Sequence, residues 1–81
     1  MSREIIDSNE LNKWLTDELQ KVEDCQGSIL TFQYRLQTPD ENGCNWSGAV
    51  VQPGPMTSAA SISVAANEIV AMARSVFNLS S

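Results

Sequence analysis

Charge is distributed very unevenly along this chain of 81 residues. Thirteen of its fifteen charged residues precede Asn42, and Glu68 and Arg74 are the only charges in the last forty positions. Because charged side chains are rarely buried, a stretch almost free of them is either packed in a core or covered by another molecule. The second half of the chain must therefore supply much of the core, a contact surface, or both.

The length of the chain allows one small domain, which we expect to span residues 1–81. A domain of this size buries only about 60–65% of the surface that its unfolded chain exposes, so its margin of stability is small. Small domains of this kind usually depend on disulfides, a bound metal, very regular packing or self-association. The chain must therefore contain one of these supports or obtain one by self-association.

A helix is expected over residues 8–24. Asp7 and Glu10 have the spacing of a capping box, in which each residue bonds the backbone of the other. Leucines and other apolar residues then recur at helical spacing and form one apolar face. Gly27 suits the left-handed conformation that commonly ends a helix.

Two strands are expected next. Apolar and polar residues alternate over residues 28–37, so the even-numbered side chains, including Tyr34, should meet the core. A weaker strand signal covers residues 46–52. The connection between them is rich in Pro, Asp, Asn and Gly, which are typical of turns.

A second helix is expected over residues 58–77, with Thr57 or Ser58 as its cap. Alternation at residues 61–64 leaves open that the segment begins as a strand instead. A separate narrow stripe of small residues, Ala60, Val64 and Ala71, lies away from the large apolar face. We expect this stripe to be an interface.

These elements predict an α+β fold in which two helices pack on one face of a small antiparallel hairpin. A sheet of only two strands is marginally stable in water and has open edges, to which another strand can pair. A homodimer that extends the sheet to four strands, or that pairs the second helices, would remove both problems.

Composition excludes several classes of function. The net charge is −5 and the five basic residues are scattered, whereas a nucleic-acid partner requires clustered Lys and Arg. No apolar run has the ~18–20 residues that a membrane span needs, and no signal peptide is recognisable at the start. We therefore expect a cytoplasmic protein with no nucleic-acid or membrane partner.

The sequence also lacks the residues of common catalytic sites. It contains no histidine, so it has no Ser-His-Asp or Cys-His arrangement of its own. Cys25 and Cys44 should lie near opposite ends of the first strand, too far apart for a disulfide. Neither belongs to a CxxC pair, and we expect no metal, no cofactor and no catalytic residue.

The segment 38–48 is the candidate for binding a ligand or a partner. Its polar, thiol and aromatic side chains could take a small ligand or a hard cation, but turn formation explains the same residues more simply. Trp46 could close over the core or stand exposed as an anchor. The candidate residues are Asp40, Glu41, Asn42, Cys44, Asn45 and Trp46.

The pattern as a whole favours a non-enzymatic accessory module that binds itself or another protein. The alternative is a protein that binds a small ligand or a metal, and could be an enzyme, through segment 38–48.

Overall fold

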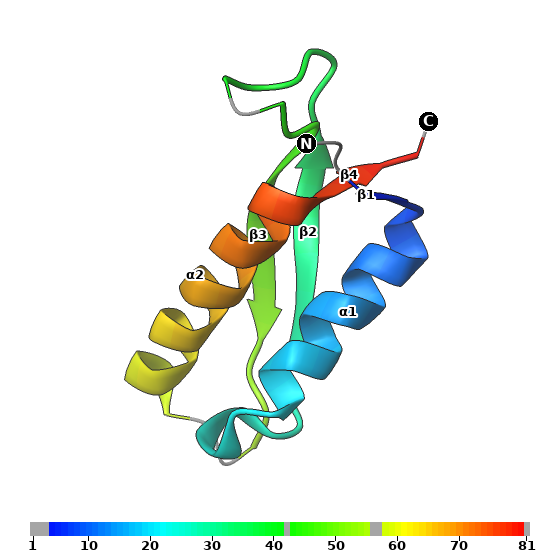
Figure 1. Cartoon of the computed structure of the whole chain (residues 1–81). Helices are drawn as coiled ribbons and strands as arrows, with labels where there is room; N and C mark the ends of the chain where they lie inside the picture. Colours follow the sequence, from blue (N-terminus) through cyan, green and yellow to red (C-terminus); the bar gives the residue numbers. More distant parts are fainter. Residues whose placement is uncertain (1–3, 42, 56–57, 81) are drawn as a thin grey trace.

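The computed structural model describes residues 4–41, 43–55 and 58–80. The fold is α+β, with two helices and two small sheets (Figure 1). Both helices lie on the same side of the central hairpin (Figure 1). In chain order the elements are β1 (Glu4–Ile6), α1 (Ser8–Gln20), the short 3₁₀ helix η1 (Glu23–Cys25), β2 (Ile29–Arg35), β3 (Trp46–Gln52), α2 (Ala59–Val76) and β4 (Phe77–Leu79).

Helix α1 begins as its capping residues predict. The Asp7 carboxylate accepts a hydrogen bond of 2.8 Å from the backbone N–H of Glu10. Three leucines one helical turn apart are buried on its inner face: Leu11, Leu15 and Leu19. The α-helix ends at Gln20, earlier than expected, because Val22 is extended and the next three residues tighten into η1. Gly27 has a φ of 84°, which confirms its left-handed conformation after this last turn.

Strands β2 and β3 form the predicted antiparallel hairpin, with β3 at the expected bounds and β2 shorter than expected. Side chains of α1 occupy the outer edge of β2. Thr16 Oγ1 accepts from Leu30 N at 3.1 Å and donates to Leu30 O at 2.9 Å, and Asn12 Oδ1 accepts from Phe32 N at 3.0 Å. These bonds take the place of a further strand along that part of β2.

The face of the hairpin that is buried in the core changes at Gly48. Leu30 is buried whereas Tyr34, on the same strand, is 53% exposed. Trp46 is buried whereas Val50 is 49% exposed. The two residues of each pair are four positions apart and would point to the same face of a regular strand. Gly48 has a φ of 76°, and a Cβ there would come within 2.8 Å of the Gln33 Cβ. The expectation that Tyr34 belongs to the core was therefore wrong, because the alternation of buried and exposed residues does not continue past the left-handed Gly48.

Helix α2 supplies the other wall of the core. It is helical from Ala59, so residues 61–64 do not begin as a strand. Its buried face consists of Ile62, Ala66, Ile69 and Ala73. Ser58 stands at the cap position without a side-chain bond to the helix, and Thr57 lies outside the described residues. At Phe77 the backbone becomes extended and starts β4.

Strands β1 and β4 pair in parallel and were not expected from the sequence. Glu4 lies opposite Phe77 and Ile6 lies opposite Leu79, so the two ends of the described chain form a second small sheet. Ser80 N extends this pairing with a 2.8 Å hydrogen bond to Ile6 O. Phe77 and Leu79 are buried in the core.

Replacing Gly48 tests this change of the buried face. We expect Gly48→Ala to lower the free energy of unfolding by about 1–3 kcal/mol, because a side chain at this φ is strained and meets Gln33. Urea unfolding measures the loss, with Ser47→Ala at the neighbouring position as the control. A stable Gly48→Ala protein with a Tyr34 that remains exposed would show that this glycine is not required.

Candidate interaction surface

The candidate residues of segment 38–48 bond mainly to the chain itself. The Asp40 carboxylate accepts from Arg74 at 2.5 Å through Oδ2 and from the backbone N–H of Cys44 at 3.0 Å through Oδ1. Glu41 is exposed, and Asn42 lies outside the described residues. Asp40 therefore closes its own turn and holds it against α2.

Asn45 and Trp46 hold the C-terminal strand. The Asn45 side chain donates to Leu79 O at 2.9 Å and accepts from Leu79 N at 2.7 Å, as a neighbouring strand would. Trp46 is fully buried, and its indole N–H donates to Phe77 O at 3.1 Å. Of the two alternatives for Trp46, the structure shows the first: the side chain packs in the core and does not stand exposed as an anchor.

Cys44 lies beside Arg74 at the edge of a small cavity. Its Sγ is buried and bonds Trp46 O at 3.3 Å. The hydrogen bond with Cys44 raises the pKa of the Arg74 guanidinium most, and the hydrogen bond and charge of Asp40 add to the rise. Burial opposes it. The cavity has a volume of about 260 Å³ and is lined by Asp40, Cys44, Ala71, Arg74 and Ser75.

Cys25 is a second buried thiol, at the end of η1. Both cysteines are free, so the expectation that they form no disulfide is confirmed. Burial raises the pKa of the Cys25 thiol, and the negative charge of Asp24 adds to the rise. Such a thiol stays protonated, and therefore weakly nucleophilic, to higher pH than a free one.

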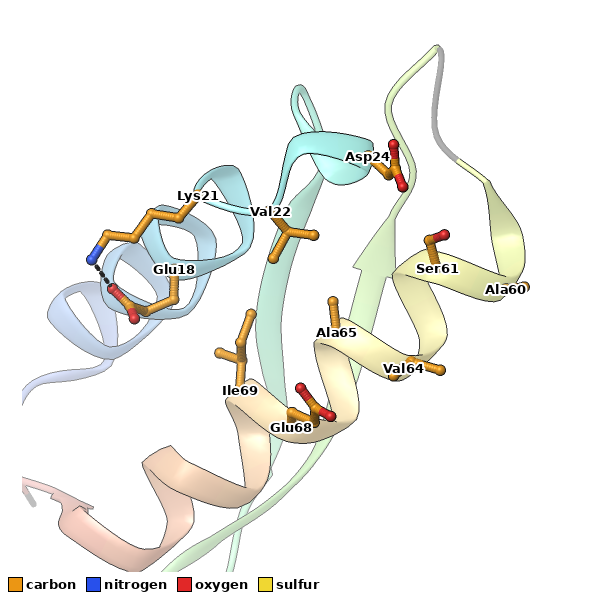
Figure 2. Close-up of a pocket in the computed structure, with 10 residues that line it drawn as sticks. All are labelled: Glu18, Lys21, Val22, Asp24, Ala60, Ser61, Val64, Ala65, Glu68 and Ile69. Carbon is orange, nitrogen blue, oxygen red and sulfur yellow. Dashed lines mark hydrogen bonds and ion pairs between the residues drawn. The ribbon is translucent and has the colours of Figure 1, made fainter.

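A larger hollow lies between α2 and the end of α1 with η1. We call it the helix groove (Figure 2). Its volume is about 680 Å³ and it is open to solvent. The side chains of Val22, Ala65 and Ile69 point into it from the two sides (Figure 2). It is lined by Glu18, Lys21, Val22, Asp24, Ala60, Ser61, Val64, Ala65, Glu68 and Ile69.

Small side chains on α2 leave the helix groove unfilled. Ser61 and Ala65 point from α2 toward η1 and Val22, and their short side chains leave space between the two walls (Figure 2). Val64 beside them is 60% exposed. The groove therefore combines an apolar wall with direct access from solvent.

The rim of the groove is acidic. Lys21 is its only basic residue among the lining residues, and it forms an ion pair of 2.5 Å with Glu18. The hydrogen bond and the charge of Glu18 raise the pKa of Lys21. Asp24 and Glu68 add two carboxylates, with no ion pair to either within the described part of the chain.

The stripe Ala60, Val64 and Ala71 is exposed on α2. Ala60 and Val64 line the helix groove, whereas Ala71 lines the cavity near Arg74. The other walls of the groove were missed, because Val22 and Ile69 read as ordinary core positions. The signal that could have revealed the groove is the run of small residues on the α1 side of α2.

The described residues show neither a cluster of metal ligands nor a membrane-spanning helix. No group of three or more His, Cys, Asp and Glu side chains in residues 4–41, 43–55 and 58–80 could hold a metal ion. Over the same residues, no helix is both long and apolar enough to cross a lipid bilayer.

Removing the Asn45 amide tests its role on the C-terminal strand. Asn45→Ala leaves the N–H and C=O of Leu79 without this partner, and we expect a loss of about 1–3 kcal/mol in the free energy of unfolding. The amide of Leu79 should also exchange its hydrogen faster. Asn9→Ala, on the exposed side of α1, is the control; equal effects of the two variants would contradict the role of Asn45.

Comparison with known proteins gives no relative from which a role can be carried over. No family model, no curated protein and no solved structure matches the chain. A function for the chain must therefore be inferred from its own geometry and charge.

Proposed function

We propose that this chain is a non-enzymatic interaction module that binds a helix of another protein in the helix groove. The observation that carries the proposal is the open, largely apolar hollow of about 680 Å³ between α2 and the end of α1 with η1. Pockets that bind small molecules in proteins commonly have volumes of about 300–1,000 Å³, so the groove is large enough to take several side chains of a partner. A groove between two helices accepts the apolar face of a third, with side chains one helical turn apart as anchors.

The chemistry of the groove supports binding rather than catalysis. Its polar lining consists of three carboxylates, one lysine and one serine, and the lysine is in an ion pair with Glu18. The carboxylates stand at the rim and the apolar side chains form the wall, as in interfaces with an apolar centre and a polar edge.

Self-association is the second candidate. Ala49 and Val51 lie opposite Phe32 and Leu30, whose backbone N–H groups point away from β3. In an antiparallel pair, the backbone groups of Ala49 and Val51 then point outward on the other edge. α1 occupies the edge of β2, so the edge of β3 favours a homodimer with a four-stranded sheet.

Titration of the labelled protein tests binding in the groove. The probe is a synthetic amphipathic helix with leucine and alanine on one face and glutamine on the other. We expect amide shifts in the NMR spectrum at groove residues, centred on Val64 and Ala65. Ala65→Leu fills the groove and should weaken binding about tenfold or more, whereas Ala59→Leu, the same change outside the groove, should not. Shifts scattered over the surface, or equal binding by both variants, would refute the proposal.

Sedimentation equilibrium tests the second candidate. A homodimer through β3 should become a monomer in Ala49→Lys, because a lysine on an edge strand opposes pairing with another strand. Ser63→Lys, on the exposed side of α2, controls for the added charge. A wild-type protein that remains a monomer at all concentrations removes this candidate and leaves binding in the groove unaffected.

A further inference from the structure

The helix groove presents uncompensated negative charge around an apolar wall. Of its four charged lining residues, three are carboxylates, and the single lysine is in an ion pair with one of them. The rim therefore has a net charge of −2, carried by Asp24 and Glu68. Figure 2 shows these two residues on opposite walls, Asp24 on η1 and Glu68 on α2.

A second copy of this chain is a poor occupant for such a rim. The chain carries a net charge of −5, so two copies repel each other. Three of the basic side chains are engaged within the chain: Lys21 with Glu18, Arg35 with Ser80 O and Arg74 with Asp40. Among the described residues, Lys13 is the one basic side chain without such a bond. Of the described basic side chains, it alone could pair with the acidic rim of another copy.

The same charges suit an occupant of the opposite sign. Lys or Arg residues beside the apolar face of a helix could reach both walls, since Asp24 and Glu68 flank the apolar side chains of Val22 and Ala65 (Figure 2). Complementary charge at the edge of an interface raises the rate of association and selects between partners. Long basic side chains also cover apolar surface with their methylene groups.

We propose that the occupant of the helix groove is a basic amphipathic helix of a different protein, with its apolar face against Val22, Val64 and Ala65 and its Lys or Arg residues on Asp24 and Glu68. This inference rests on the proposed function and adds the charge of the partner. It places specificity in the two rim carboxylates and affinity in the apolar wall.

Three peptides that differ only in charge test the inference. They share one leucine and alanine face, and the flanking positions are all lysine, all glutamine or all glutamate. At low salt we expect the lysine peptide to bind about fivefold to tenfold more tightly than the glutamine peptide, from two exposed ion pairs, and the glutamate peptide more weakly than both. The advantage of the lysine peptide should shrink at high salt because exposed charges are screened.

A matched pair of variants assigns the effect to the rim. Glu68→Lys should remove most of the advantage of the lysine peptide over the glutamine peptide, because it replaces one of the two rim carboxylates with a positive charge. Asp17→Lys makes the same change of charge on the exposed side of α1, outside the groove, and should preserve most of the advantage. Circular dichroism confirms that both variants remain folded.

The possible outcomes separate this inference from the proposed function. Equal affinity for the lysine and glutamine peptides, with shifts in the groove, overturns the basic partner and leaves the groove as a binding site. Tighter binding of the glutamate peptide has the same meaning. No groove shifts with any of the three peptides overturns both proposals together.

Discussion

The burial of Trp46 is the interaction on which the rest of the structure depends. Trp46 is the largest fully buried side chain in the described part of the chain, and it stands at the start of β3. Its ring lies at 65° to that of Phe32, with 6.2 Å between the centroids, and its N–H reaches Phe77 O. One side chain thus links both strands of the hairpin to the C-terminal strand. Phe77 in turn contacts Trp14 of α1 edge to face, with 5.1 Å between the ring centroids.

Local patterns predicted the helices and the hairpin well because each signal lies within a few neighbouring residues. The cap at Asp7, the positive φ at Gly27 and the bounds of β3 all follow from short stretches of sequence. Tyr34 was misplaced because the alternation of its own strand gives no sign of the left-handed Gly48 on the neighbouring strand, where the buried face of the hairpin changes. Strands β1 and β4 were missed because each has three residues and its partner lies at the opposite end of the chain.

The candidate site of segment 38–48 shows the same limit in chemical terms. Asp40, Asn45 and Trp46 are residue types that commonly bind ligands, and each of them does bind something here: Arg74, Leu79 and Phe77 of the same chain. No local pattern could reveal this, because the partners lie more than thirty positions away. The helix groove was missed for a related reason: its two walls, α2 and the end of α1 with η1, are far apart in the sequence, and only their packing shows the space that small side chains leave.

The parallel pairing of β1 with β4 has a mechanical consequence. In a parallel pair, the first residue of one strand and the last residue of the other lie at opposite ends of the ladder. Tension applied through residues 4 and 79 would therefore load the hydrogen bonds of this sheet together, in shear, instead of opening them one at a time. A pull on the ends of the described chain would meet its resistance first at this short sheet, before it reached the hairpin and the core.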